Sequence, residues 1–280
     1  MTNGLYIVAT PIGNLSDISE RAKTLLKDAD VIACEDTRVT KKLLGLLNIG
    51  FSGKKFITLH DHNEQEKAQE VIDLVNQGLC VVQVSDAGSP LISDPGYKLI
   101  RQCHEQNTPF AVVPGCCAII CALQMSGLPT NRFMFAGFIP NKDKAREDLF
   151  KELAGIDTTL VFYETAPRLL KTLGVAKKIF ANREFAVARE ITKMHEECKT
   201  GTADDVIAYF EKNPPKGEIV FMVAPPSDEP VSGVDVEQIL RDKMKKAPLK
   251  TAVKEAVTEY GLNKNNVYEL AIKIKNEQQV

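Results

Sequence analysis

Residues 5–34 read LYIVATPIGNLSDISERAKTLLKDADVIAC, and this stretch decides the fold. Two short apolar runs, 5–9 and 30–34, have the length and composition of buried strands. The segment between them has a helical pattern, and Asp17 with Glu20 three residues later predicts a capping box at its start. A strand, a helix and a second strand in this order predict a parallel βαβ unit with a right-handed crossover.

The same alternation continues towards residue 126. Further apolar or β-branched runs bounded by turn residues lie at 55–59, 79–84 and 109–113. Helical patterns lie at 18–29, 38–47, 62–77, 94–106 and 116–126. We therefore predict a first α/β domain, residues 1–128, with a mainly parallel sheet.

After Gly127-Leu128-Pro129 the spacing of apolar runs and helical patterns changes, which predicts a second α/β domain, 129–226, with a mixed sheet. Its apolar runs lie at 132–138, 158–163, 184–190 and 217–224, and its helical patterns near 143–154, 166–179 and 202–212. Residues 225–233, PPSDEPVSG, have the composition of a linker. Three helical patterns follow, so we expect a helical module at 234–280 in which Gly261 ends the middle helix.

Composition narrows the class of protein. The 280 residues are 44% hydrophobic and 26% charged, which is typical of a soluble globular enzyme. There is no run of 18 apolar residues, and the start MTNGLYIVATP lacks the features of a signal peptide, so we expect a cytoplasmic protein outside the membrane. A net charge of −2 argues against broad coating of nucleic acid by charge, so any RNA contact must be a local patch.

The seven cysteines indicate packed, reduced thiols. They form no C-x-x-C pair and have no histidine at ligand spacing. Cys116 and Cys121 suit a metal in principle, but zinc needs four convergent ligands, so we expect no metal site.

Small, turn-forming residues follow several predicted strands. Residues 10–17, TPIGNLSD, contain one glycine instead of G-x-G-x-x-G, which weakens a dinucleotide-binding interpretation and leaves a simple capping turn open. Residues 85–96, SDAGSPLISDPG, combine two glycines, two prolines and two aspartates. Small side chains allow a ligand to approach the backbone, and prolines hold the loop in shape, so we predict ligand binding there.

Two further predicted strands are followed by residues that could bind a ligand or take part in a reaction. Residues 34–38, CEDTR, place two carboxylates and a guanidinium together, either as a functional cluster or as a structural salt bridge between Arg38 and Asp36. Residues 113–118, VPGCCA, put small residues at a helix start, where free backbone N–H groups can hold polar atoms. In an open parallel sheet, ligands bind outside the carboxyl ends of the strands, where these loops converge.

These loops, in this order, resemble the tetrapyrrole methylase superfamily. Within it, LYIVATPIGNLSDIS, DVIACEDTR, LHDHNE and VSDAGSPLISDPG resemble the branch of ribosomal RNA 2′-O-methyltransferases I, over roughly residues 4–225. The resemblance implies two α/β domains with a cofactor cleft between them, plus the helical module. It also implies S-adenosylmethionine, a homodimer, and small-subunit ribosomal RNA as partner, methylated on a cytidine ribose in the decoding region.

The resemblance also transfers residues by position. The cofactor-binding residues that it implies are Pro11, Gly13, Asp86, Gly88, Ser89, Cys116, Cys117, Ala118, Tyr163, Glu164, and Ala224 or Pro225. This chain departs from the branch at Cys116 and Cys117, where P-G-P-S-A is common, because a thiol is a weaker donor than a hydroxyl. It departs again at Ala166, where a histidine is expected before Arg168.

A ribose hydroxyl needs a group that takes its proton as the methyl carbon is attacked. Glu35 and Asp36 are favoured; His62, Glu64, His195 and Glu196 are alternatives. The residues expected to meet the RNA substrate are Arg38, His62, Glu64, Arg168, Arg189, Lys193 and His195. Residues 62–64 also suit a helix cap. A basic cluster in the module suits phosphates or a solvated helix face, and comprises Lys243, Lys245, Lys246, Lys250 and Lys254.

Two rival functions stay open at this point. The superfamily also permits methylation of a small molecule such as a tetrapyrrole, although the CEDTR and LHDHNE segments and the helical tail do not resemble that branch. The departures at Cys116, Cys117 and Ala166 are compatible with an RNA-binding protein that keeps the cofactor pocket without turnover.

Overall fold

The computed structural model describes residues 3–60, 63–180, 182–226, 236–260, 262 and 264–277. The chain divides into two compact units. Unit 1 comprises Met1–Cys121 with Ile191–Lys193, and unit 2 comprises Ala122–Glu190 with Met194–Val280. The domain limits expected from the sequence stay predictions. No helix among the described residues is both long and apolar enough to cross a membrane.

The described part of unit 1 contains a five-stranded sheet with the order β3-β2-β4-β1-β5, in which every pair is parallel. The strands are β1 (Gly4–Val8), β2 (Val31–Cys34), β3 (Lys55–Thr58), β4 (Cys80–Val84) and β5 (Phe110–Val113). The helices are α1 (Glu20–Asp28), α2 (Thr37–Leu46), α3 (Glu64–Asn76) and α4 (Tyr97–Gln106), and α5 (Ala118–Ser126) spans the boundary between the two units. The predicted parallel α/β sheet is confirmed.

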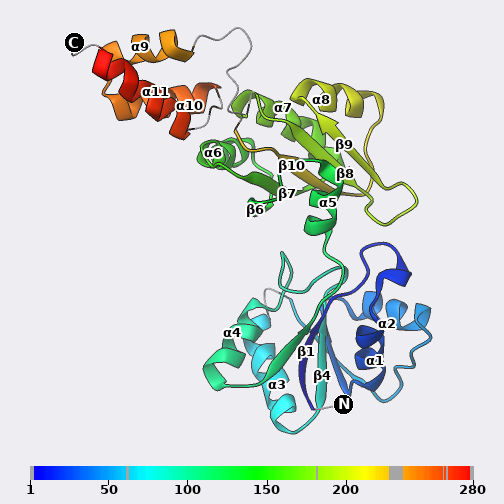
Figure 1. Cartoon of the computed structure of the whole chain (residues 1–280). Coiled ribbons are helices and arrows are strands. Elements are labelled where there is room, and N and C mark those ends of the chain that lie inside the picture. Colours follow the sequence, from blue (N-terminus) through cyan, green and yellow to red (C-terminus); the bar gives the residue numbers. More distant parts are fainter. Residues whose placement is uncertain are drawn as a thin grey trace. The chain divides into compact units, whose positions relative to one another are not determined.

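Helices cover both faces of this sheet (Figure 1). Tyr6 and Val8 of β1 point to one face and share a buried cluster with Leu25 of α1. Leu5 and Ile7 point to the opposite face, where side chains of α3 and α4 cover them. Both faces are therefore buried, which explains why the strands are continuous apolar runs instead of alternating ones.

The start of α1 differs from the sequence prediction. Ser19 is the N-cap, and its hydroxyl accepts a hydrogen bond from the Ala22 amide. Asp17 lies before the cap, in the short 3-10 helix Leu15–Asp17. The predicted capping box of Asp17 and Glu20 is therefore wrong, because Ser19 is also a preferred N-cap residue and lies one position before Glu20.

The described part of unit 2 contains a five-stranded sheet with the order β6-β7-β10-β8-β9. Strands β6 and β7 are parallel and the other pairs are antiparallel, so the predicted mixed sheet is confirmed. The elements are β6 (Phe133–Phe138), α6 (Asp143–Leu153), β7 (Thr159–Thr165), the 3-10 helix η2 (Ala166–Arg168), α7 (Leu169–Ile179), β8 (Phe185–Arg189), β9 (Glu197–Gly201), α8 (Ala203–Lys212) and β10 (Glu218–Val223). Buried phenylalanines from the sheet and from α6 form its core.

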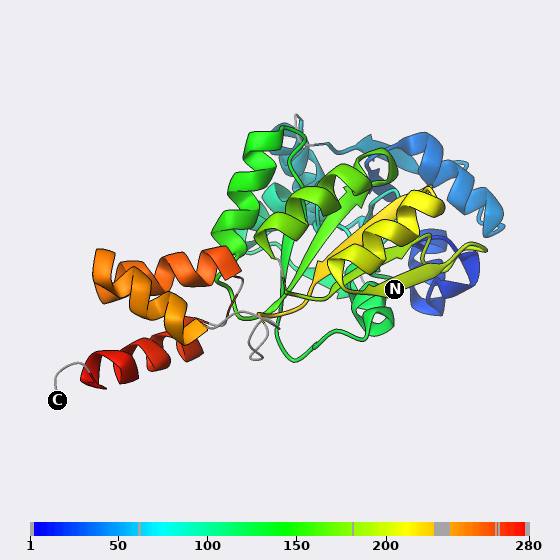
Figure 2. The same cartoon turned by 90° about the horizontal axis from the view of Figure 1, so that it is seen from above.

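Three C-terminal helices of unit 2 pack into a bundle, drawn in orange to red in Figure 2. They are α9 (Val236–Lys246), α10 (Leu249–Tyr260) and α11 (Lys264–Glu277). Leu240, Val257 and Ala271, one from each helix, belong to a shared buried cluster. The predicted helical module is confirmed. Gly261 and the predicted linker beyond Pro226 lie outside the described residues.

Candidate active site

The loops that follow β1 and β4 are joined at the carboxyl edge of the unit 1 sheet. Thr10 and Gly88 exchange two backbone hydrogen bonds, with N···O distances of 2.9 and 3.1 Å. The buried Thr10 hydroxyl also donates to the Ser85 carbonyl at 3.2 Å. From β1 the chain continues to β2, and from β4 to β5, in opposite directions along the sheet. The junction is therefore a topological switch point, the usual ligand position in open α/β sheets.

A third loop, after β5, packs onto the same junction. The Ser89 hydroxyl donates to the Cys116 carbonyl at 3.0 Å, and the Cys116 thiol donates to the Asp17 carbonyl at 3.5 Å. Gly88 has φ +78°, and a Cβ there would lie 3.3 Å from Ile12 Cγ2. A Cβ on Gly115 would lie 2.9 Å from Ala9 Cβ. The three loops thus approach one another at distances that favour glycine.

The loop after β4 also contains strained backbone. Leu91 and Ser93 have φ values of 72° and 66°, which residues other than glycine seldom adopt. Such outliers persist only where surrounding structure holds them, and they concentrate at functional sites. Surrounding structure therefore holds the 85–96 loop in a conformation that its residues would seldom adopt alone, which is compatible with the ligand-binding role predicted for it.

The acidic cluster after β2 is largely organised by its own contacts. The Asp36 carboxylate caps α2 by accepting from the Arg38 amide at 2.8 Å, and it accepts from the Arg38 guanidinium at 3.1 and 2.6 Å. The guanidinium holds the pKa of Asp36 at about 2, below the ordinary value of 3.8. The salt-bridge alternative for these two residues is confirmed. Because Asp36 binds protons weakly, it is a poor proton acceptor.

Asp86 connects the acidic cluster to the 85–96 loop. Its carboxylate accepts a hydrogen bond from the Asp36 amide at 3.1 Å. Partial burial, together with the charge of the Asp36 carboxylate, raises the pKa of Asp86. Glu35 directly precedes Asp36 in the acidic cluster and is half-buried.

Glu64 has a structural position. Its side chain lies at the start of α3, and the residue is only 3% exposed. Oε1 accepts from the backbone amides of Gly96 and Lys98 at 2.9 and 2.6 Å, and from that of Leu99 at 3.3 Å. The carboxylate therefore caps the N-terminus of α4 and holds the end of the 85–96 loop, which leaves it unsuited to contact a substrate. His62, predicted beside it, lies outside the described residues.

Gly13 packs against the segment 191–193, which belongs to unit 1 by its contacts. A Cβ on Gly13 would lie 2.5 Å from Lys193 Cγ and 2.7 Å from Thr192 Oγ1. The neighbouring Asn14 amide donates to Thr192 Oγ1 at 3.1 Å. The absence of a side chain at Gly13 thus makes room for Lys193, which was predicted to contact substrate.

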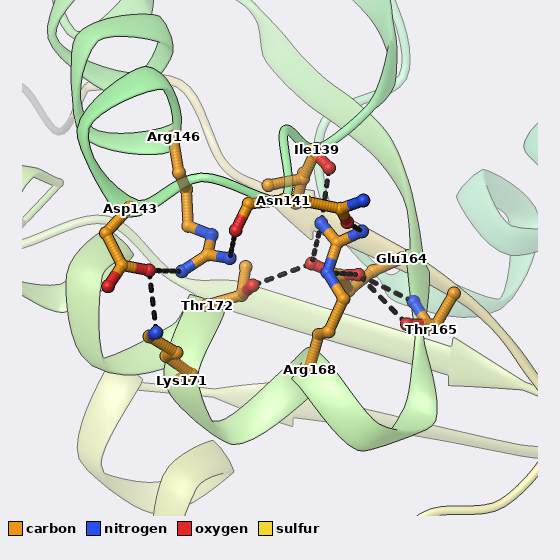
Figure 3. Close-up of polar contacts among 9 residues, drawn as sticks. All are labelled: Ile139, Asn141, Asp143, Arg146, Glu164, Thr165, Arg168, Lys171 and Thr172. Carbon is orange, nitrogen blue, oxygen red and sulfur yellow. Dashed lines mark hydrogen bonds and ion pairs between the residues drawn. The ribbon is translucent and has the colours of Figure 1, made fainter.

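The polar residues after β7 form a closed network in unit 2 (Figure 3). The fully buried Glu164 carboxylate accepts from the Thr172 hydroxyl at 2.6 Å and from the Thr165 amide at 2.7 Å. It pairs with the Arg168 guanidinium, which also donates to the Asn141 side chain and the Ile139 carbonyl. These partners account for the Glu164 carboxylate and for most of the Arg168 guanidinium, which favours structural roles for both; the cofactor and RNA contacts expected for them stay predictions.

Arg189 is likewise paired within unit 2. Its guanidinium contacts the Glu197 carboxylate of β9, which also accepts from the Tyr209 hydroxyl. Tyr163 packs against the rings of Phe135 and Phe138. The sequence did not predict β9, because its residues, ECKTG, are mostly polar and lack an apolar alternation.

The remaining predicted residues of unit 2 have simpler surroundings. Ala224 is buried, and its amide donates to the Glu184 carbonyl at 2.8 Å; Pro225 follows it and is half-buried. His195 is exposed in the β8–β9 connection. Among the residues that the structure describes, no group of three or more His, Cys, Asp and Glu side chains is arranged to hold a metal ion.

Unit 1 therefore gathers one set of predicted residues at a single sheet edge. This set lies in the loops after β1, β2, β4 and β5, and comprises Pro11, Gly13, Glu35, Asp36, Arg38, Asp86, Gly88, Ser89, Cys116, Cys117 and Ala118. Backbone polar groups, small side chains and flanking carboxylates together suit the binding of a polar organic ligand.

The fold and this edge define a class of protein. Residues 4–207 match the tetrapyrrole (corrin/porphyrin) methylases. Among solved structures, a diphthine synthase aligns with a TM-score of 0.61 at 14% identity, covering 79% of this chain and 89% of that one. The methyltransferase CobJ aligns with a TM-score of 0.60 at 16% identity, covering 82% and 97%. At these identities the solved structures show the fold.

Curated relatives narrow the class. The chain is 46% identical over 275 residues to the ribosomal RNA small subunit methyltransferase I of Erythrobacter litoralis, covering 98% of this chain and 96% of that protein. It is 40% identical to the protein of that name from Escherichia coli O157:H7, covering 96% and 94%. Residues 230–275 match the RsmI C-terminal HTH (helix-turn-helix) domain. The chain therefore belongs to the ribosomal RNA small subunit methyltransferase I family, whose members depend on S-adenosylmethionine.

Proposed function

We propose that this protein transfers the methyl group of S-adenosylmethionine to the ribose 2′-oxygen of a cytidine in small-subunit ribosomal RNA, within the decoding region. The observation that carries the proposal is the junction of three small-residue loops at the switch point of unit 1, in a chain of this family. The name shared by the relatives supports the RNA substrate. The cytidine and its 2′-oxygen follow from the family resemblance.

The residues at the junction fit this cofactor. Gly88 and Gly115 lie where a side chain would press on Ile12 or Ala9, so the loops pack closely. Beside them, Ser89, Cys117 and Ala118 are small and partly exposed, which leaves backbone donors and acceptors accessible to a nucleoside and an amino acid. We assign cofactor binding to this group together with Pro11, Asp86 and Cys116. The bound sulfonium supplies an activated methyl group.

The protein's own residues position the ribose and accept its proton. Because the Arg38 ion pair depresses the proton affinity of Asp36, we assign proton acceptance from the 2′-hydroxyl to Glu35 instead. Asp36 then acts as a positioning residue that fixes Arg38. The Arg38 side chain is 90% exposed despite this ion pair, and it suits an RNA phosphate. Lys193 and His195 are the other substrate contacts that we retain.

We also propose that the protein acts as a homodimer in the cytoplasm. The apolar side chains Phe133, Met134 and Phe138 of β6 are exposed on an edge strand of the unit 2 sheet. Exposed apolar edge strands are unfavourable in a monomer, and a second copy of the chain would cover this one. Light scattering coupled to size exclusion tests the mass, and Phe138→Glu is expected to shift it towards the monomer.

The test of function is transfer of labelled methyl groups to small ribosomal subunits, protein-free ribosomal RNA and porphyrin precursors in parallel, followed by mapping of the modified nucleotide. We expect incorporation at a cytidine ribose of the small-subunit RNA. The variant Glu35→Gln should keep cofactor affinity and lower the transfer rate by about 10²-fold or more. Incorporation into the porphyrin precursor instead would replace the proposed substrate, and binding without incorporation would indicate a protein without turnover.

A further inference from the structure

Helix α11 presents large apolar side chains to solvent. Tyr268 and Ile272 are each 39% exposed, and their spacing of four residues places them on one face of the helix. The neighbouring face, centred about 90° around the helix, carries Val267, Ala271 and Ile274, which are buried in the core of the C-terminal bundle. Tyr268 and Ile272 are therefore not required for the bundle's own core.

Lysines lie at both ends of this exposed face. Lys264 is four residues before Tyr268, and Lys275 is three residues after Ile272. At 100° per residue, the four side chains lie within an arc of about 80° and along about 16 Å of helix. We call Lys264, Tyr268, Ile272 and Lys275 the α11 stripe. Lys264 and Lys275 make no ion pair with any residue in the described part of the chain.

Charge distinguishes this module from the rest of the protein. Residues 236–277 contain nine Lys and Arg against six Asp and Glu, a net charge of +3, whereas the whole chain carries −2. Part of the basic cluster predicted from the sequence is already paired, because Lys243 contacts Glu259 at 2.6 Å and Lys245 contacts Asp242 at 2.9 Å. Among the described residues, no carboxylate pairs with the cationic groups of the α11 stripe.

We propose that the α11 stripe binds the substrate RNA, with phosphates at Lys264 and Lys275 and an unstacked base on the ring of Tyr268. This inference rests on the proposed function and assigns a second RNA contact to it. An aromatic ring between two cations matches unpaired RNA, in which bases stack on side chains and phosphates flank them. Protein interfaces are depleted in lysine, which disfavours a protein partner.

The position of the stripe agrees with this assignment. The module matches a helix-turn-helix domain, and α11 is the last of its three helices, separated from α10 by three residues. In three-helix modules of this type the last helix is the one that contacts nucleic acid.

The experiment measures binding of the full-length protein to a fluorescently labelled small-subunit ribosomal RNA transcript over a series of salt concentrations. We expect Tyr268→Ala to weaken binding about tenfold, while Tyr268→Phe, which retains the ring, keeps the affinity. The double variant Lys264→Gln with Lys275→Gln should reduce the slope of log K against log salt by about 1.5. The control variant, Lys273→Gln, removes an exposed lysine of the same helix outside the stripe and should leave affinity near that of the unchanged protein.

The outcomes separate this inference from the proposed function. Thermal melting first shows that each variant is folded. If Tyr268→Ala binds the transcript as tightly as the unchanged protein does, the inference is overturned. If the variant loses binding to intact subunits but not to the transcript, the inference is also overturned, and the α11 stripe would bind a ribosomal protein instead. Methyl transfer by the unchanged protein is measured separately: its absence refutes the proposed function, while the loss of transcript binding in the stripe variants would still support the RNA surface.

Discussion

The loop junction of unit 1 and the Glu164 network of unit 2 are both polar regions at strand ends, yet they are built differently. At the junction, backbone groups of Thr10 and Gly88 hold the loops together, and small side chains surround them. In the network, the buried Glu164 carboxylate and the Arg168 guanidinium contact each other and neighbouring polar groups. The comparison teaches that a charge at a strand end marks a ligand site only where the fold leaves it unsatisfied or accessible.

The largest effect is expected from Glu164→Ala. It leaves the Arg168 guanidinium without its carboxylate partner in a mostly buried place, and breaking a buried pair in this way costs about 3–5 kcal/mol. Urea denaturation should show this loss as a lower midpoint. Asp148→Ala is the matched control, because Asp148 pairs with Lys144 on α6 and both side chains of that pair are well exposed, so it should cost less than about 1 kcal/mol.

The same variant also tests the role implied by family resemblance. If Glu164 binds the cofactor, Glu164→Ala would lower S-adenosylmethionine affinity tenfold or more at a temperature where the variant is folded. Unchanged stability with such a loss would refute the structural role. We expect the reverse: Glu164→Ala should lower the stability of the fold and leave the S-adenosylmethionine affinity unchanged.

Glu64→Ala should have the next largest effect, about 2 kcal/mol. The carboxylate accepts three amide hydrogen bonds at the N-terminus of α4, and charge-assisted bonds of this kind are stronger than neutral ones. Glu64→Gln keeps an acceptor oxygen and should cost about half as much. Equal stability of both variants and the unchanged protein, measured by urea denaturation, would contradict the capping role.

The fold was largely predictable because it depends on local patterns. Strands buried on both faces, here β1, β2 and β4, are short apolar runs, and apolar or β-branched runs indicated all of β1 to β5 within one or two residues. The polar strand β9 has no such pattern and was missed. The cap of α1 was misplaced because Asp17 and Ser19 are both good N-cap residues.

The site was predictable in part, for a related reason. Glycine and proline in the 85–96 loop indicate backbone accessibility by their own chemistry. The role of Glu64 depends on Gly96, 32 residues away, and no spacing rule connects the two. Glu197, the partner of Arg189, lies on the strand that the sequence did not indicate. Whether a charge is paired is thus decided by distant partners that only the fold identifies.

A smaller effect, on binding instead of stability, is expected at the junction. Asp86→Ala should weaken S-adenosylmethionine binding about tenfold, which corresponds to about 1.4 kcal/mol, because it removes a carboxylate beside the cofactor loops and the acceptor for the Asp36 amide. Calorimetric titration measures the affinity. Asp94→Ala, in the same loop, is the comparison. Equal losses for both variants would indicate a general loosening of the loop and contradict a specific role for Asp86.

The smallest effect concerns Asp36 at acid pH. A carboxylate whose pKa is about 2 in the folded protein and 3.8 ordinarily stabilises the fold above pH 4, and this contribution is lost as pH falls towards 2. Asp36→Asn keeps an N-cap oxygen for α2 but removes the charge. The urea midpoint of the unchanged protein should therefore exceed that of the variant slightly at pH 5, and the difference should vanish near pH 2. Because the pair is exposed, 1 M salt should shrink the difference at pH 5. A difference that is the same at pH 5 and pH 2 would show that the Arg38 ion pair is not its cause.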